Sequence, residues 1–208
     1  MARLITRENR SAYPVLVQSM HSDRKRVFVD IMKWDVPHDA YGERDSFDDE
    51  FSEYLIVQDQ QTGDHLASMR LLRTDRPHLL GDVFPHLCDE GVPTGPDIRE
   101  VTRLCMSPRL RARERLAARN VLIRSMVEYA LLTGIRAYTG VADMGWLAQI
   151  LSAGWDCRPL GLPQMIGGSM VGALIIHIEP NTLQMFVDSW RCDAPTLNVL
   201  EFDTRLAA

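Results

Sequence analysis

The order of helical and strand-like segments limits the fold of this chain more than any single residue does. Apolar residues recur at three- and four-residue steps over about 10–33, which predicts a helix there. An acidic, polar connection over 38–53 follows. Two β-prone runs, 54–58 and 65–73, then flank a Thr-Gly-Asp turn, so we expect a hairpin.

The rest of the chain alternates between strands and helices. After a Pro-rich loop over 74–97, the pattern predicts a strand over 98–106, a helix over about 110–133, a strand over 136–141, a helix over 144–152, a short segment over 155–160, a strand over 172–179 and a helix that opens near Asn181. This order indicates an α/β sandwich around a mixed sheet. The motifs GxGxxG, GxxxxGK[ST] and GxSxG are absent from the sequence, so nucleotide-phosphate loops and a nucleophile elbow are unsupported.

Composition narrows the class of protein. The chain has 208 residues, a length that fits one domain, and 46% of them are hydrophobic, as in globular proteins. No apolar run reaches the ~20 residues of a membrane helix, and the first ten residues lack the apolar core of a signal peptide. We therefore expect a cytoplasmic protein without membrane insertion. The net charge of −5 argues against a nucleic-acid partner.

Cysteine and histidine spacing argues against a metal site. No CxxC, HxxH or HxxxH pattern occurs. The four cysteines, which we expect to be reduced thiols, are Cys88, Cys105, Cys157 and Cys192.

Four charged residues lie inside predicted apolar elements: Arg24, Arg70, Glu100 and Arg103. A buried charge costs several kcal/mol unless it is paired, so these arginines need carboxylates. The natural suppliers are Glu100, Asp45 and Asp48. Two interpretations remain open at this point: a structural ion-pair network, or a polar cleft that grips a zwitterionic ligand.

Glu100, Arg103 and Trp34 would line such a cleft only under particular conditions. Glu100 and Arg103 are three positions apart, so a regular strand would aim them at opposite faces, and both can line one cleft only if the strand bulges. Trp34 follows the first helix and would ordinarily belong to the core. Beside carboxylates that bind a cation, its ring could instead stack on a flat ring or a sulfonium.

A row of arginines crowds the start of the helix over 110–133: Arg109, Arg111, Arg113, Arg115 and Arg119. Cations at a helix N-terminus oppose the helix dipole, and like charges four residues apart repel each other. The row is therefore either a solvated face or a surface for an anionic partner, such as an acidic carrier protein, a phosphate-bearing cofactor or nucleic acid.

Taken in order along the chain, these residues resemble the acyl-homoserine-lactone synthases, the LuxI-type autoinducer synthases of bacterial quorum sensing. The motifs that carry the resemblance are Arg24-x-x-x-Phe28, Trp34, Glu43-x-Asp45-x-x-Asp48, Ser68-x-Arg70-Leu71, the Pro77–Pro85 stretch with Phe84, Glu100-x-x-Arg103, and Tyr138–Val141 before Gly154-Trp155. Each motif is unspecific alone, but their joint order over about 20–160 is specific.

The resemblance implies a fold and a domain organisation. The fold would be a GNAT-like three-layer α-β-α sandwich around a mixed, largely antiparallel sheet with a V-shaped cleft. One autoinducer synthase domain would span 1–208. Within it, about 1–50 would form a lid and helix on the S-adenosylmethionine side, and about 98–178 would line an acyl tunnel.

The resemblance also implies a reaction. An acyl thioester, on acyl carrier protein or coenzyme A, would acylate the amine of S-adenosylmethionine, and ring closure would release methylthioadenosine. S-adenosylmethionine is then a substrate, and no cofactor is expected. An amine that titrates near ~8 needs a base, for which Glu100 and Glu43 are the candidates.

The residue roles that the resemblance implies fall into four groups. Arg103 would join Glu100 and Glu43 in the catalytic group. The substrate-binding group would be Phe28, Trp34, Asp45, Arg103, Phe84 and Thr139, with Thr139 near the third carbon of the acyl chain. A structural ion-pair lattice would comprise Arg24, Asp45, Asp48, Arg70 and Glu100. A docking face for the carrier would comprise Arg109, Arg111, Arg115 and Arg119.

Other functions stay open on the residues alone. Leu104 stands where many family members have an aromatic residue, so we expect the adenosine pocket to differ in its fine shape. The loop over 107–113 lacks the glycines with which coenzyme-A acetyltransferases cradle pyrophosphate. The alternatives are a GNAT-like N-acyltransferase on another amine, a variant with Cys105 as acyl carrier, and a non-catalytic module that binds acyl ligands. Acyl length, acyl donor and oligomeric state are not predicted.

Overall fold

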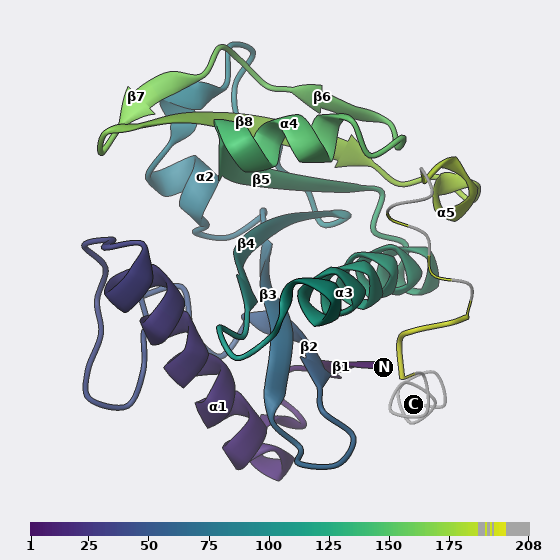
Figure 1. Ribbon diagram of the computed structural model, residues 1–208. Helices are drawn as coiled ribbons and strands as arrows, with labels where there is room; N and C mark the ends of the chain where they lie inside the picture. The colour runs from purple at the N-terminus through teal and green to yellow at the C-terminus, as the bar shows by residue number, and fades with distance from the viewer. Residues whose placement is uncertain (187–189, 191, 193, 199–208) are drawn as a thin grey trace. The chain divides into compact units, whose positions relative to one another are not determined.

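The computed structural model describes residues 1–186, 190, 192 and 194–198 (Figure 1). Its helices are the 3-10 helix η1 (Arg10–Ala12), α1 (Pro14–Arg24), the π-helix η2 (Lys25–Ile31), α2 (Leu79–Asp82), the 3-10 helix η3 (Pro85–Leu87), α3 (Ala112–Thr133), α4 (Met144–Leu151) and α5 (Thr182–Met185). Its strands are β1 (Ala2–Ile5), β2 (Glu53–Gln58), β3 (His65–Arg73), β4 (Ile98–Met106), β5 (Ala137–Asp143), β6 (Cys157–Pro159), β7 (Gln164–Ile166) and β8 (Ser169–His177).

The strands form a mixed sheet of eight strands in the order β1-β2-β3-β4-β5-β8-β6, with β7 paired to β8. The predicted α/β fold around a mixed sheet is confirmed. None of the described helices combines the length and apolar character needed to cross a bilayer.

Contacts divide the chain into two compact units, each assembled from separate segments. Among the described residues, the first unit comprises 1–70, 103–128, 192 and 194–198, and the second comprises 71–102, 129–186 and 190. Strands β3 and β4 each contribute to both units. The single synthase domain over 1–208, the lid over about 1–50 and the tunnel over about 98–178 stay predictions.

A small core in the first unit joins α1 to two strands. Leu16, Val17 and Met20 on α1 pack with Ile5 on β1 and with Tyr54 and Ile56 on β2, two residues apart on one face of that strand. β1 pairs antiparallel with β2 from Ala2↔Val57 to Ile5↔Tyr54. This core fixes α1 against β1 and β2, the strands that precede and follow it along the chain.

The outer edge of β1 is covered by a later segment of the same unit. The Ala2 N–H donates to Thr196 O at 2.7 Å, and the Asn198 N–H donates to Ala2 O at 2.9 Å. The Glu128 carboxylate on α3 accepts the main-chain N–H groups of Thr196 and Leu197. Sequence reasoning missed β1, because a four-residue strand that contains an arginine carries almost no alternation signal.

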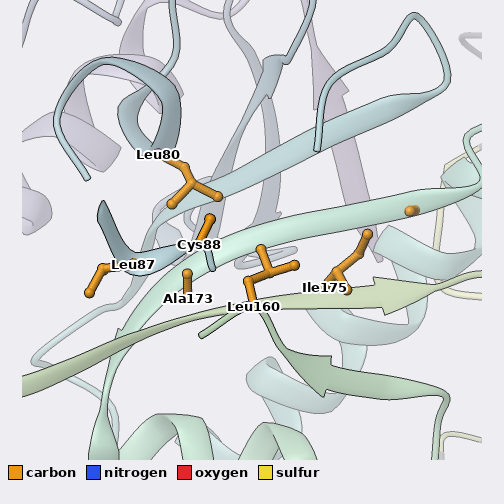
Figure 2. Packing of buried hydrophobic residues seen from close by; sticks show 7 residues of the cluster. Leu80, Leu87, Cys88, Leu160, Ala173 and Ile175 are labelled. Carbon is orange, nitrogen blue, oxygen red and sulfur yellow. The ribbon is translucent and has the colours of Figure 1, made fainter. Parts of the chain in front are cut away.

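The second unit is organised around β8. Strand β5 pairs antiparallel with β8 along its whole length, and β6 and β7 pair with different parts of β8. The Cα partners of β4 and β5 run parallel from Ile98↔Ala137 to Val101↔Gly140. Figure 2 shows six labelled members of the apolar cluster of this unit, which consists of Leu80, Leu87, Cys88, Ala137, Leu160, Ala173 and Ile175.

Three predicted elements differ from the structure, and one of them is the Pro-rich loop over 74–97, which contains the short helices α2 and η3. The helix expected over about 10–33 is an α-helix only over Pro14–Arg24 and continues as the π-helix Lys25–Ile31. The strand expected over 172–179 runs from Ser169 to His177, because the turn before it is a two-residue hairpin loop. Gly167 and Gly168 have φ of +57° and +85°, and these left-handed conformations favour glycine.

Candidate active site

Six charged side chains of the first unit form one largely buried network, called the ion lattice here. Its three guanidinium groups and three carboxylates belong to Arg24, Arg70, Arg103, Glu43, Asp45 and Asp48. None of these side chains is more than 10% exposed. The predicted pairing of the buried arginines with carboxylates is present, and the formal charges of the six groups sum to zero.

Arg24 and Arg70 hold the centre of the lattice. The Arg24 guanidinium donates from Nε to Glu43 Oε2 at 2.6 Å, and from Nη1 and Nη2 to the two oxygens of Asp48 at 2.8 Å each. Arg70 donates to both oxygens of Asp45, at 2.5 and 3.1 Å, and its Nη1 lies 3.0 Å from Asp48 Oδ1. Paired donors of this kind match the planar fork of guanidinium to carboxylate.

Arg103 joins the lattice from an irregular point of β4. Its Nη2 lies 3.0 Å from Glu43 Oε1 and 2.6 Å from Asp45 Oδ2, and its Nε lies 3.1 Å from Glu43 Oε1. Its φ is +50°, a left-handed conformation that costs a non-glycine residue about 1 kcal/mol or more. The strand therefore departs from regular geometry at the residue where the sequence required a bulge for a shared cleft.

The lattice controls the ionisation of its members. Burial opposes the ionised form of Asp48, but the hydrogen bonds and positive charge of Arg24, together with Arg70, hold the pKa of that carboxyl well below its usual range. Burial and the negative charge of Asp48 raise the pKa of Tyr54, which donates to Asp48 Oδ1 at 2.8 Å, to about 12. Asp48 is therefore ionised and Tyr54 protonated at neutral pH.

An aromatic pair lies next to the lattice in the same unit. The rings of Phe28 and Trp34 stack with centroids 4.9 Å apart and planes 6° apart. Phe28 is buried in η2, and the Arg103 guanidinium carbon lies 5.8 Å from its ring centroid. Trp34 remains 43% exposed, so part of its surface is available to a ligand. The π-helix places this stack, and the sequence pattern did not reveal that change of pitch.

Glu43 is a member of the ion lattice, whereas the sequence predicted it only as a candidate base. Its carboxylate is fully buried, and its two oxygens accept from Arg24 and Arg103. Its main chain is bound by His21, which sequence reasoning missed because nothing in the spacing distinguishes this histidine.

A second buried network in the first unit surrounds Asp23. Its carboxylate lies 2.9 Å from His65 Nδ1, and the His65 Nε2 lies 2.9 Å from Ser68 Oγ. Arg109 donates to both oxygens of Asp23, at 2.8 and 3.1 Å. One predicted docking residue is thus also an ion-pair partner, although 44% of its side chain stays exposed.

Of the remaining arginines of the row, Arg111 directly precedes α3, and Arg113, Arg115 and Arg119 lie within it. Arg111, Arg113 and Arg115 are exposed, and Arg119 is partly buried. Burial lowers the pKa of Arg119. Their predicted use in docking an acyl donor stays a prediction.

The other predicted site residues lie in the second unit. Glu100 is fully buried, and its Oε1 accepts the Leu80 N–H at 2.9 Å. Thr139 is the register partner of Glu100 on β5, and its hydroxyl has no hydrogen-bond partner among the described residues. Phe84 is partly buried against the apolar cluster of Figure 2. The predicted place of Glu100 in the ion lattice stays a prediction.

The profile of the autoinducer synthase family matches residues 9–185. The chain belongs to this family. The autoinducer synthase is 30% identical to an isovaleryl-homoserine lactone synthase of Bradyrhizobium diazoefficiens, over 90% of this chain and 84% of that protein. It is 31% identical to an acyl-homoserine-lactone synthase of Ralstonia nicotianae, over 76% of this chain and 80% of that protein.

Solved structures agree with the fold. The CoA-dependent acyl-homoserine lactone synthase BjaI, solved with SAM and isopentyl-CoA, superposes with a TM-score of 0.85 at 27% identity, over 95% of this chain and 92% of that one. An acyl-CoA N-acyltransferase from Pseudomonas aeruginosa shares the fold at a TM-score of 0.58 and 14% identity, over 84% of this chain and 97% of that one. The GNAT-like fold is thus confirmed. The autoinducer synthase is an acyltransferase that makes an acyl-homoserine lactone from S-adenosylmethionine and an acyl thioester.

Replacing His21 by Asn should make the stability of the folded protein depend less on pH between about 6.5 and 4. Burial and the charge of Arg24 lower the pKa of His21 to about 4, below the ~6.5 of an unfolded chain. Between these values the unfolded chain binds more protons, so the wild type loses stability as pH falls from about 6.5 to 4.

The His21→Asn variant has no titrating group at this position. Its thermal midpoint, measured by circular dichroism, should therefore fall less steeply with decreasing pH over that window than the midpoint of the wild type. Parallel profiles would show that His21 does not titrate in this way. Above pH 7.5 the slopes should coincide, which serves as the internal control.

Proposed function

We propose that the ion lattice and the Phe28–Trp34 stack bind S-adenosylmethionine. The observation that carries the proposal is the exposure within the lattice: Asp45 and Arg103 are 10% and 9% exposed, and the other members are at most 3% exposed. The lattice therefore offers one carboxylate and one guanidinium to a ligand. These match the amine and the carboxylate of a methionyl group, and Trp34 offers a ring face for adenine or the sulfonium.

We assign proton removal to Glu100 and a structural role to Glu43. Both oxygens of Glu43 are occupied by guanidinium donors, which leaves the carboxylate little capacity to accept a further proton. Glu100 is the other carboxylate that the family resemblance implies as a base, and its Oε1 atom accepts the Leu80 N–H. The amine of S-adenosylmethionine must lose its proton before it can attack, and a carboxylate within hydrogen-bond reach can take it.

The reaction then has two bond exchanges. The free amine attacks the thioester carbonyl carbon, an amide bond forms, and the thiolate of the donor leaves. The methionyl carboxylate next attacks the γ-carbon, the bond from that carbon to the sulfonium breaks, and methylthioadenosine leaves. Arg103 would hold the carboxylate in line for this second step.

We propose acyl-CoA as the acyl donor and the arginine row as its binding surface. The similarity to BjaI, which is CoA-dependent, supports the donor. The exposed arginines at the start of α3 supply cations for the phosphates of coenzyme A, and the same face would suit an acidic carrier protein. Thr139 offers a hydroxyl to the acyl chain. We place the reaction in the cytoplasm, where both substrates are made.

The reaction itself is tested by mass spectrometry of products from purified protein, S-adenosylmethionine and a mixed pool of acyl-CoA and acyl-carrier thioesters. We expect acyl-homoserine lactone and methylthioadenosine from the wild type, and at least a hundredfold slower turnover from Trp34→Ala and Arg103→Ala with circular dichroism unchanged. Turnover near the wild-type rate in either variant would contradict the proposed binding site. An acylated amine without methylthioadenosine would indicate a different N-acyltransferase.

Charge reversal of Arg111, Arg115 and Arg119 to Glu tests the donor surface. We expect the KM for the acyl donor to rise at least tenfold, because the phosphates or the carrier would meet repulsion, and the KM for S-adenosylmethionine to stay within twofold. Reversal of the exposed Arg158 in the second unit is the matched control. Equal increases in the KM values for both substrates would show that these arginines do not bind the acyl donor.

A further inference from the structure

One residue of α1, His21, binds the main chain of Glu43 on both sides. The Glu43 N–H donates to the His21 carbonyl oxygen at 3.1 Å, and the Glu43 carbonyl oxygen lies 2.9 Å from His21 Nδ1. Because a carbonyl oxygen only accepts, Nδ1 carries the proton and donates. The main chain of a lattice carboxylate is therefore fixed to α1 by two hydrogen bonds to a single residue.

Gly42 makes this approach possible. A Cβ at position 42 would lie 2.7 Å from His21 Cβ and 2.9 Å from the His21 carbonyl carbon, closer than real Cβ contacts allow. The Asp39 carboxylate accepts the N–H groups of Tyr41 and Gly42 at 2.7 and 2.9 Å and so fixes the turn that leads into this contact. The loop thus lies directly on the helix backbone at His21.

Glu43 transmits this attachment to the lattice. Its Oε2 accepts from Arg24, one turn along α1 from His21, and its Oε1 accepts from Arg103. Arg103 lies within β4 in a left-handed conformation, and both Nε and Nη2 of its guanidinium donate to Glu43 Oε1. A shift of the Glu43 main chain would therefore move the Arg103 guanidinium.

The ring of His21 is also fixed from the strand side. It lies edge-on to the Tyr54 ring, with centroids 6.1 Å apart and planes 80° apart, and Tyr54 donates to Asp48. His21 is 3% exposed. The imidazole thus fills a defined space between α1, the loop and β2, with one nitrogen aimed at the Glu43 carbonyl.

We infer that His21 is a positioning residue for S-adenosylmethionine binding, which acts through the main chain of Glu43 on the guanidinium of Arg103. This inference rests on the proposed role of Arg103 and extends it to a residue outside the lattice. The His21 ring binds the main chain of the loop. Its replacement should therefore change the position of the Arg103 guanidinium and leave the reacting groups unchanged.

Two near-isosteric substitutions distinguish a hydrogen-bonding role of His21 from a role in packing alone. In His21→Asn the amide nitrogen falls near the place of Nδ1 and can still donate to the Glu43 carbonyl, whereas in His21→Gln it falls near the place of Nε2. We expect the KM for S-adenosylmethionine to stay within threefold of wild type in His21→Asn and to rise about tenfold in His21→Gln, the effect of one lost hydrogen bond. The KM for the acyl donor should change in neither.

Hydrogen exchange of the Glu43 amide gives a readout that does not depend on activity. The His21 carbonyl oxygen that accepts this amide remains in both variants, so a change in protection reports how often the loop opens. Protection should persist in His21→Asn and fall about tenfold in His21→Gln, where the ring's hydrogen bond to the Glu43 carbonyl is lost, at matched thermal midpoints. If the wild type made no lactone, the proposed function would fail. The difference in amide exchange between the two variants would still test whether the His21 ring holds the Glu43 main chain.

Equal KM values for S-adenosylmethionine in the two variants, whether both unchanged or both raised, would overturn the inference. If His21→Gln does not fold, Gly42→Ala tests the same contact from the loop side. We expect it to raise the KM for S-adenosylmethionine and to reduce protection of the Glu43 amide, and wild-type values for both would overturn the inference.

Discussion

The cost of burying six ionised groups governs the first unit. Arg24 and Arg70 are at most 1% exposed, and each would cost several kcal/mol without its carboxylate partners. The partners come from the acidic loop over 38–53, so this loop cannot leave α1 without stranding two guanidinium groups. The course of the loop and the conformation of Arg103 both follow from this constraint.

Stability alone does not explain why a fold would retain such a lattice, because well-packed apolar side chains are often as stabilising as a buried ion network. A preorganised set of charges is valuable where a charged substrate must be held without reorganisation. S-adenosylmethionine carries a cationic sulfonium, an amine and a carboxylate. Within the lattice Asp45 and Arg103 alone keep appreciable exposure, which matches the amine and carboxylate of that substrate.

The sequence predicted those parts of the site whose chemistry conflicts with their surroundings. Arg70 between apolar strand neighbours required a carboxylate partner, and the structure supplies two. It did not predict the π-helix or the binding of Glu43 by His21. Helix pitch at η2 depends on tertiary contacts, and the His21–Gly42 approach is a main-chain contact between segments about twenty residues apart, which no residue pattern encodes. The strands β2 to β5 were predicted along the chain from runs of β-forming residues, whereas the short strands β1 and β7 carry too little pattern.

The central claim, that the lattice binds S-adenosylmethionine through an Arg103 guanidinium held by Glu43, is tested most directly by a double-mutant cycle measured with titration calorimetry. S-adenosylmethionine is titrated into the wild type, Glu43→Gln, Arg103→Lys and the double variant. If Glu43 acts on the ligand through Arg103, the double variant loses no more affinity than Arg103→Lys alone. Losses that add, or an unchanged Kd in Arg103→Lys, would contradict the claim.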